Sequence, residues 1–410
     1  MGKYKTYFVV IGFYLFIILL DAYSYWGLSL FGFYNLFIFN IIYWSIPIFY
    51  ILGFSSIFLF KPKNISPDGF KKVMLFFASF LLFYLPKIFF FPFVLVSDML
   101  KILGYISKDL QEWVIVLQTI VTIGVIAAAF IFLATLNGIL WQRFNFKITK
   151  IPLNFKNLPN SFEGFRIVQI SDFHIGSFIG NMKHVQRGID MVNEQKPDIV
   201  LFTGDLITVQ ADEVERFLPV LKQLKAKYGM YSVTGNHSYS GKDYFHWNKV
   251  DSPEENLNKI VNYHKLIGFD ILMNEHREIT LNGDSISLIG IENWGHPPFP
   301  QEGDIEKAIE NIKEDSFKIL MSHDPSFFDA KVVPDYNIDL TLSGHTHAMQ
   351  MGFKIGNYEW SPAKFKYPKW GGLYRENGKT LYVNRGFGHV IYSARIGIPP
   401  EITVIDLMKA

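Results

Sequence analysis

The 410-residue chain contains no cysteine, which excludes disulfide bonds, thiolate metal ligands and a cysteine nucleophile. It also lacks a strong charge imbalance. The formal net charge is +2 at pH 7, so electrostatics give no reason to expect a nucleic-acid partner. No internal repeat or low-complexity linker is present. The length exceeds that of one ordinary domain, so we expect at least two structural units.

Aromatic and aliphatic residues are in excess, and they gather before about residue 140 of a chain with 40 Phe and 21 Tyr. A membrane-spanning helix needs about 20 mainly apolar residues. We therefore predict that residues 1–140 form a transmembrane region with spans near residues 7–27, 34–60, 73–96 and 113–136. A cleaved signal peptide is the alternative for the first span. It is disfavoured because no small-residue cleavage site follows and three more spans do.

The placement of basic residues predicts the orientation of these spans. Four lysines occupy residues 61–72, and three basic residues occupy residues 143–150. The loop at residues 28–34 has no charge, and the loop at residues 97–112 mixes two lysines with three acidic residues. Because positively charged loops stay in the cytoplasm, we expect a multi-pass protein of the cell membrane with a cytoplasmic C-terminal domain.

Two ionisable residues lie inside the predicted spans: Asp21, near the end of the first, and Lys87, which follows Pro86 in the third. Desolvating an intramembrane charge costs several kcal/mol unless it is paired. Two interpretations stay open. In the first, the two residues belong to a functional site; a transport function is the most weakly supported version, because it rests on these two residues alone. In the second, Lys87 snorkels to the interface or pairs with Asp21.

The composition changes after residue 140. Residues 141–162 are polar and basic and contain two prolines, which suits a connector that leaves the membrane interface. From residue 163 to 410, short apolar runs typical of strands first alternate with segments of helical periodicity and then follow one another. This pattern predicts an α/β domain with a mixed sheet or two packed sheets.

Five short polar motifs each follow one of the apolar runs, where a rigid strand end lets side chains converge. Their candidate ligands are Asp172, His174, Asp205, Asn236, His323, His345 and His347. Taken singly, each is more often a turn, cap or surface residue. Together, carboxylates and imidazoles suit Mn, Fe or Zn better than calcium. Their number exceeds the needs of one ion and indicates two divalent ions that share a carboxylate.

The motifs Asp172-x-His174, Gly204-Asp205, Gly235-Asn236-His237, His323 and Gly344-His345-x-His347 resemble the signature of the calcineurin-like metallophosphoesterase superfamily. The resemblance covers residues 163–408, within a domain that we place at residues 163–410. Residues 322–325 and 395–402 are similar to its bacterial membrane-associated phosphodiesterase branch. The resemblance implies two β-sheets flanked by helices, with a dinuclear metal site at the strand ends.

The same resemblance implies a role for each matching residue. The first ion would bind Asp172, His174, Asp205 and His347, and the second Asp205, Asn236, His323 and His345, with Asp205 bridging. His237 would protonate the leaving oxygen. The chain departs from the family in two places: Ser238 stands where an acidic residue usually orients the histidine, and Ala348 and Met349 stand where the branch commonly has glycines.

This ligand set implies direct hydrolysis: a hydroxide that bridges two ions attacks phosphorus, and His237 donates a proton to the departing alkoxide. Arg375, Arg385 and Arg395 are candidate phosphate clamps, because a guanidinium pairs bidentately with phosphate. Each of them alone is more often a surface or structural arginine. Two aromatic, basic loops at residues 239–249 and 353–370 suit either the membrane interface or an ordinary cap over the site.

We therefore expect a membrane-anchored phosphodiesterase or pyrophosphatase that acts on a lipid-linked or membrane-proximal phosphate. One alternative is a UDP-diacylglucosamine pyrophosphatase of lipid A synthesis, which resembles the same superfamily. Another is a non-catalytic membrane sensor of a phosphate ligand, for which Ser238 leaves room. The expected partners are the lipid bilayer and a phosphorylated substrate, with lipids among the candidates, and no nucleic acid.

Overall fold

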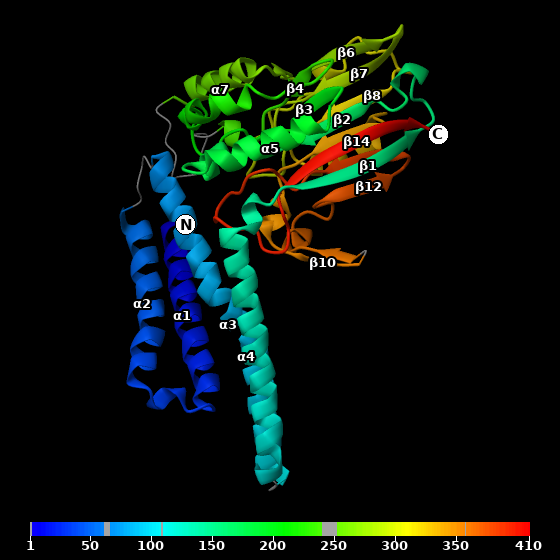
Figure 1. The fold of residues 1–410 in the computed structure, drawn as a ribbon. Coiled ribbons are helices and arrows are strands. Elements are labelled where there is room, and N and C mark those ends of the chain that lie inside the picture. The colour runs from blue at the N-terminus through cyan, green and yellow to red at the C-terminus, as the bar shows by residue number, and fades with distance from the viewer. Residues whose placement is uncertain (1, 61–65, 108–109, 240–251, 357) are drawn as a thin grey trace. The chain divides into compact units, whose positions relative to one another are not determined.

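The computed structural model describes residues 2–60, 66–107, 110–239, 252–356 and 358–410. The chain forms two compact units (Figure 1). The first, here called the helical unit, contains Met1–Pro62 and Phe76–Asn137. The second, here called the β-rich unit, contains Lys63–Leu75 and Gly138–Ala410.

Four long helices carry the N-terminal third of the chain: α1 (Gly2–Ser29), α2 (Phe37–Phe60), α3 (Pro67–Ser107) and α4 (Leu110–Leu140). Each is long and apolar enough to cross a membrane, which confirms the predicted four-helix transmembrane region. The helices extend beyond the predicted spans. The largest difference is in α3, whose 41 residues continue through Pro86 and Pro92. A membrane helix tolerates proline because neighbouring groups satisfy the freed backbone carbonyls.

The two charges inside the spans form an ion pair between Lys87 of α3 and Asp21 of α1, whose side chain is fully buried. Tyr84 donates a hydrogen bond to Asp21 Oδ2 at 2.8 Å, and Tyr43 donates one to the Asp21 carbonyl at 2.7 Å. The Lys87 ammonium also lies 5.0 and 4.7 Å from the ring centres of Tyr43 and Tyr84. This arrangement favours pairing over snorkelling for these two residues.

The β-rich unit is built on two six-stranded mixed sheets, which confirms the predicted α/β class. The first sheet has the order β1 (Lys147–Phe155), β14 (Glu401–Lys409), β2 (Arg166–Ile170), β3 (Ile199–Phe202), β4 (Met230–Ser232) and β5 (Asp270–Ile271). The second has the order β12 (Gly372–Glu376), β13 (Lys379–Val383), β9 (Leu340–Ser343), β8 (Lys318–Met321), β7 (Asp284–Gly290) and β6 (Glu275–Leu281).

Helices and one small hairpin complete this unit: α5 (Met182–Glu194), α6 (Leu218–Leu221), α7 (Pro253–Ile267), α8 (Ile305–Ala308), α9 (Val333–Asp335) and the pair β10 (Phe353–Ile355) and β11 (Tyr358–Trp360). Helix α7 begins at the Ser252 side chain, which accepts from the Glu255 N–H, and ends at Gly268 with a φ of 110°. These are the usual start and stop signals of a helix.

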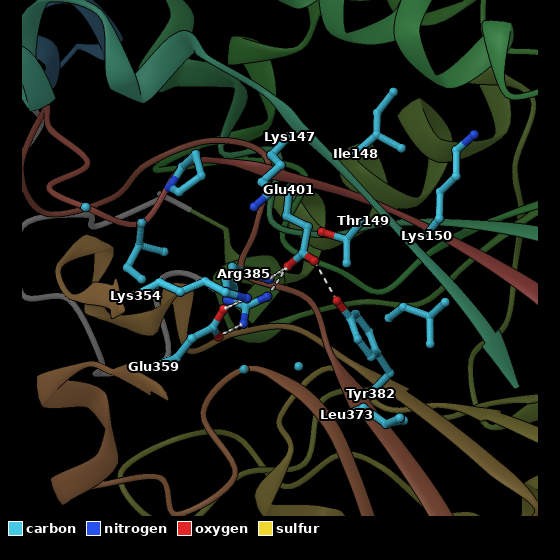
Figure 2. Close-up of a pocket in the computed structure, with 16 residues that line it drawn as sticks. Lys147, Ile148, Thr149, Lys150, Lys354, Glu359, Leu373, Tyr382, Arg385 and Glu401 are labelled. Atoms are coloured by element: carbon cyan, nitrogen blue, oxygen red, sulfur yellow. Dashed lines mark hydrogen bonds and ion pairs between the residues drawn. The ribbon is translucent and has the colours of Figure 1, made fainter. Parts of the chain in front are cut away.

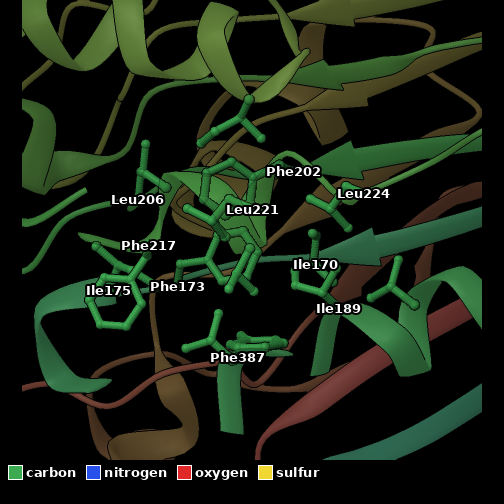
Figure 3. Packing of buried hydrophobic residues seen from close by; sticks show 14 of the residues in the cluster. Ile170, Phe173, Ile175, Ile189, Phe202, Leu206, Phe217, Leu221, Leu224 and Phe387 are labelled. Atoms are coloured by element: carbon green, nitrogen blue, oxygen red, sulfur yellow. The ribbon is translucent and has the colours of Figure 1, made fainter. Parts of the chain in front are cut away.

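Strand β3 shows how the core is divided. Ile199 and Leu201 point into an apolar cluster shared with strands of the second sheet, whereas Val200 and Phe202 point into the cluster under the helices. This alternation is the period of two in a strand. Figure 3 shows the helix-side cluster around Phe173 and Phe202. Since both faces of β3 are buried, the sequence shows a continuous apolar run.

Residues 141–162, predicted to be a connector, contain an element of the sheet. Lys147–Phe155 form β1, which pairs in parallel with β14 from Lys147 opposite Glu401 to Phe155 opposite Lys409. As an edge strand, β1 keeps exposed polar side chains and accommodates Pro152. The sequence did not indicate a strand here because β14, with which β1 pairs among the described residues, lies at the far end of the sequence.

Candidate metal centre

The five polar motifs meet where strands of both sheets end. Strands β2, β3 and β4 run parallel in the first sheet, and β8 and β9 run parallel in the second. Five of the seven predicted ligands have a positive φ: Asp172 (54°), His174 (40°), Asp205 (61°), His345 (68°) and His347 (49°). Non-glycine residues seldom adopt this region, and such strain is typical of functional sites.

The first cluster contains Asp172, His174 and His347, whose ligand atoms all lie within 4.8 Å of one another. His347 Nε2 is 3.2 Å from Asp172 Oδ1. The Nε2 atoms of His174 and His347 approach to 3.0 Å. Two imidazole nitrogens and a carboxylate oxygen that converge in a buried space suit a divalent cation, which accepts lone pairs from all three.

The second cluster contains Asp205, His323 and His345. His323 Nε2 lies 3.1 Å from Asp205 Oδ2 but forms no hydrogen bond of acceptable geometry, although it is fully buried. The Oδ1 atom of Asn236 is 2.8 Å from His345 Nδ1. A buried polar atom without a partner is costly. A divalent ion among these residues would satisfy it, so the donor set fits a metal.

Asp205 connects the two clusters. Its Oδ2 atom is 3.1 Å from His323 Nε2 and 3.6 Å from His174 Nε2. Its Oδ1 atom accepts a hydrogen bond from the His237 backbone N–H at 2.9 Å. One carboxylate oxygen therefore accepts a hydrogen bond from the backbone, and the other lies between histidines of both clusters.

Backbone carbonyls orient three of the histidines. The Nδ1 atom of His174 lies 3.0 Å from the Ile207 carbonyl, and that of His323 lies 2.7 Å from the Thr203 carbonyl. A carbonyl only accepts, so each Nδ1 carries a proton and Nε2 is the ring nitrogen that faces the cluster. Such an outer contact fixes the tautomer that a metal requires.

His237 is held in the same way, with Nδ1 donating to the Thr208 carbonyl at 2.7 Å. Its ring lies 4.6 Å from the His174 ring, and it forms a third close group with His174 and Asp205. The group that orients this ring is thus a neutral backbone carbonyl. The structure therefore brings His237 to the metal cluster with an oriented imidazole.

The electrostatic field of the centre favours a cation. Burial lowers the pKa of His323, but the Asp205 and Asp172 carboxylates outweigh burial and raise this pKa to about 9. Burial lowers the pKa of His345 to about 4, against the opposing effect of Asp324. Burial also lowers the pKa of His347. Two carboxylates therefore attract one positive charge while most imidazoles stay neutral and able to donate lone pairs.

The backbone after His347 keeps a conformation that suits glycine. Ala348, Met349 and Gln350 have φ values of 52°, 47° and 55°. Ala348 and Met349 are the two positions where glycines are expected of the branch. The departure therefore changes the side chains but leaves a left-handed turn, which is strained for residues with a Cβ.

Comparison with known proteins identifies the family. Residues 165–349 match the family Calcineurin-like phosphoesterase, and residues 5–143 match "Probable Calcineurin-like phosphoesterase, transmembrane domain". The metallophosphoesterase YkuE of Bacillus subtilis is 30% identical over 258 residues, which cover 61% of this chain and 81% of YkuE. The chain belongs to the calcineurin-like phosphoesterase family.

The transmembrane protein with metallophosphoesterase domain of Danio rerio is 32% identical over 271 residues. The match covers 64% of this chain and 58% of that protein, so the chain spans less than two thirds of this relative's length. A solved structure, the NAD nucleotidase NadN of Haemophilus influenzae, is similar over 55% of this chain and 45% of that chain, with 17% identity and a TM-score of 0.36.

Membership of the calcineurin-like phosphoesterases confirms the predicted enzyme class, a metal-dependent phosphoester hydrolase. It also implies divalent metal ions, for which the Asp and His clusters provide ligands. The transmembrane match and the four apolar helices make the chain a membrane protein.

Arg385, a predicted phosphate clamp of this phosphoesterase, is engaged elsewhere. Its guanidinium pairs with Glu401 at 3.1 Å and with Glu359 (Figure 2). Tyr382 donates to the other oxygen of Glu401 at 2.5 Å. These residues line a cavity of about 640 Å³ at the edge strands β1 and β12, and none of the seven predicted ligands lines it. Two carboxylates hold Arg385, which leaves it poorly placed to bind phosphate.

The other two predicted clamps differ in their surroundings. Arg395 is fully buried and donates hydrogen bonds to three carbonyls of the loop before it, at 2.8 to 3.0 Å. It supports the turn beside His347, whose Nδ1 lies 3.3 Å from the guanidinium. Arg375 is exposed on β12, which is separated from β9 by β13. The order of residues in the sequence could not reveal these positions.

Glu213 supports the centre and was not indicated by any motif. It is buried, and its carboxylate accepts hydrogen bonds from the backbone N–H groups of Gly176, Thr208, Val209 and Gln210 at 2.7 to 3.1 Å. Burial raises the pKa of Glu213 to about 7, although these N–H groups oppose the rise. The carboxylate thereby fixes the loop whose carbonyls orient His174 and His237.

Tyr367 reaches the centre from the predicted aromatic loop at residues 353–370. Its hydroxyl lies 2.8 Å from His345 Nε2, and Asp324 Oδ2 lies 3.4 Å from the same atom. This loop therefore starts near the metal ligands and returns to them. The other predicted loop, residues 239–249, lies outside the described residues from residue 240 onward.

Proposed function

We propose that the chain is a dinuclear-metal phosphohydrolase that cleaves a phosphodiester or pyrophosphate in a lipid-linked or membrane-proximal substrate. One observation carries the proposal: Asp205 connects two clusters of Asp and His residues. Within each cluster the ligand atoms lie within 4.8 Å of one another. A carboxylate shared by two such clusters suits two ions a few ångströms apart, the arrangement that clamps a phosphoryl group in an in-line displacement.

In this proposal the first ion is held by Asp172, His174, Asp205 and His347, and the second by Asp205, Asn236, His323 and His345. Mn, Fe and Zn all suit this donor set. When bound, such ions supply Lewis acidity, which activates water as a nucleophile and offsets the charge on the phosphoryl oxygens.

The residues of the chain then perform the remaining tasks. The carbonyls of Ile207 and Thr208 hold His174 and His237 in fixed orientations. The Nδ1 proton of His237 is held by a carbonyl, so Nε2 faces the substrate. When Nε2 is protonated, it is the proton donor. It donates that proton to the leaving oxygen as the bond to phosphorus breaks. Burial of the ligands keeps bulk water from competing.

We further propose that the β-rich unit lies on the cytoplasmic side of the membrane. The support is the distribution of basic residues, with four lysines at residues 61–72 and none at residues 28–34. A cytoplasmic position limits the substrates to soluble phosphates of the cell and to lipids of the inner leaflet.

The test is metal-dependent hydrolysis of bis(p-nitrophenyl) phosphate by the full chain in vesicles. Replacing Asp205 by Asn removes a charge that both ions share, so we expect at least about a 100-fold loss of rate, since weaker outer contacts already cost 10- to 100-fold. The matched control is Asp190→Asn on the exposed side of α5, which should leave the rate unchanged. Metal content is measured in parallel.

Two outcomes would contradict the proposal. An Asp205→Asn variant with the rate of the unaltered chain would show that the cluster is not the catalytic site. A chain that binds metal fully but hydrolyses neither diesters nor pyrophosphates would instead support a sensor.

A further inference from the structure

A short hairpin begins six residues after His347, the last predicted ligand. Strands β10 and β11 pair with Phe353 opposite Trp360, Lys354 opposite Glu359 and Ile355 opposite Tyr358. Residues directly opposite in a pair share a face, and so do residues two apart along a strand. One face of the hairpin is therefore entirely apolar, and the other carries the ion pair of Lys354 and Glu359 at 2.7 Å.

The apolar face is open rather than packed into a core. The exposed fractions are 71% for Ile355, 57% for Tyr358 and 42% for Phe353. Phe365, in the turn that follows the hairpin, is 86% exposed, the highest value for a large apolar side chain in the described part of the chain. A gathering of such side chains on a soluble surface marks an interaction site.

Ring contacts join these residues into one surface. The rings of Phe353 and Tyr358 are 6.1 Å apart, those of Phe353 and Trp360 are 5.7 Å apart, and those of Trp360 and Phe365 are 6.2 Å apart. We use the name aromatic face for the following set: Phe353, Ile355, Tyr358, Trp360 and Phe365.

Two strained apolar residues of the same unit, Met349 and Ile391, are also exposed. Met349, with a φ of 47°, is 53% exposed, and Ile391, with a φ of 66°, is 59% exposed. Tyr392 donates a hydrogen bond to the Met349 carbonyl, so the two segments are tied together. A β-branched residue in the left-handed region is a rare outlier. Here the strain holds an apolar side chain in an exposed position.

The composition indicates what covers the face. Residues 353–369 carry four lysines against one glutamate. Lys354 and Lys369 form ion pairs with acidic side chains. The other two are Lys364 and Lys366, and the Lys366 ammonium lies 5.3 Å from the centre of the Tyr367 ring. Aromatic rings mixed with lysines are typical of the headgroup region of a bilayer, where rings enter the interface and lysines meet lipid phosphates. The chain's own apolar helices anchor it in a bilayer.

We propose that the aromatic face inserts into the headgroup region of a bilayer that contains anionic phospholipid. Tyr367, two residues beyond Phe365, contacts the metal ligand His345, so insertion brings the lipid surface to the edge of the centre. The consequence for substrate rests on the proposed function: the cleaved phosphate ester belongs to the headgroup of a membrane lipid, which does not need to leave the bilayer.

The absence of cysteine allows a direct test on the full chain. Single-cysteine variants Ile355→Cys, Lys354→Cys and Leu266→Cys are labelled with an environment-sensitive fluorophore and reconstituted in vesicles of phosphatidylcholine and phosphatidylglycerol. Leu266 is the matched control, an apolar residue 42% exposed on α7. Doxyl-labelled lipid should quench most of the fluorescence at position 355 and little at positions 354 and 266.

The same labels distinguish other occupants. Quenching of the label at position 355 by aqueous iodide and not by doxyl lipid would overturn the proposal, because the face would then be open to water. A label protected from both quenchers would overturn it too, because a protein surface would cover the face, either a second copy or another segment of the chain.

A second measurement separates this proposal from the proposed function. The double variant Ile355→Ser, Phe365→Ser should lower the hydrolysis of a vesicle-borne phosphodiester relative to that of soluble bis(p-nitrophenyl) phosphate. An unchanged ratio of the two rates would count against the lipid consequence. If the unaltered chain cleaves neither substrate, the proposed function fails, while the quenching result still decides whether the face meets lipid.

Discussion

Individual carbonyl oxygens set the chemistry of the histidines at this centre. Each of three histidines has its Nδ1 atom 2.7 to 3.0 Å from a backbone carbonyl oxygen: His323 from Thr203, His174 from Ile207 and His237 from Thr208. A carbonyl fixes the tautomer as a carboxylate does, but it adds no negative charge to stabilise an imidazolium. In this contact His237 is therefore oriented without an acidic partner.

His264 provides a pH test at the residue scale, away from the metal ligands. It is buried on α7, with Nδ1 2.8 Å from Ser232 Oγ, and burial lowers its pKa to about 3. An unfolded histidine has a pKa of about 6.5, so the folded state binds fewer protons between these values. Stability contributed by neutral His264 is thus present above pH 6.5 and is lost as the pH falls.

We expect the unaltered chain to lose about 2 kcal/mol of unfolding free energy between pH 6.5 and 5 relative to His264→Gln, at about 1.4 kcal/mol per pH unit. Urea unfolding of the β-rich unit, followed by tryptophan fluorescence, measures the difference. His296→Gln, at an exposed histidine, is the control and should keep the pH dependence. The same pH dependence in His264→Gln would contradict the assignment.

At the scale of elements, the segment between β3 and α6 organises the site. It begins with Thr203 and Asp205, presents the Ile207 and Thr208 carbonyls, and closes on Glu213. The Glu213 carboxylate accepts four backbone N–H groups, two on each oxygen. The segment has little regular structure of its own, so this carboxylate replaces the hydrogen bonds that a helix or strand would provide.

Replacing Glu213 by Gln turns one acceptor oxygen into an amide nitrogen that faces two N–H donors. Each donor left without a partner costs about 1–3 kcal/mol. We expect the loop to shift and the affinity for the first metal ion to fall about 10- to 100-fold, as for other losses of an outer contact. Metal titration of the full chain measures this affinity.

The control for Glu213→Gln is Glu215→Gln, because Glu215 is exposed in the same segment and accepts a hydrogen bond from the Tyr263 side chain rather than from the loop backbone. That variant should bind metal normally. If Glu213→Gln bound metal as tightly as the unaltered chain, the loop would not depend on this carboxylate, and His174 would be positioned by other contacts.

The sequence allows some elements to be predicted and hides others for physical reasons. β3 was evident because both of its faces are apolar. β1 was not, because an edge strand keeps polar side chains and β14, with which it pairs, is distant in the sequence. The predicted metal ligands lie in local motifs, whereas the Thr208 carbonyl leaves no trace in residue type. The partners of Arg385 likewise depend on how the sheets pack.

At the scale of the whole molecule, only a short stretch of sequence separates the last apolar helix from the first strand. Helix α4 ends at Leu140 and β1 begins at Lys147, so the intervening residues span at most about 20 Å when extended. A catalytic domain on such a short tether experiences a high effective concentration of membrane-borne substrate. This advantage is absent for a freely diffusing substrate, which agrees with the proposed lipid-linked phosphate.

The proposed orientation of the chain in the membrane is open to a direct measurement. Basic residues flank the apolar spans on the side of the β-rich unit, and the loop at residues 28–34 carries no charge. In intact cells, a membrane-impermeant maleimide should label Leu30→Cys but reach Lys313→Cys only after lysis. Both positions are exposed, and the cysteine-free parent gives the background. Labelling of Lys313→Cys in intact cells would place the metal centre outside the cytoplasm and require a substrate of the outer leaflet.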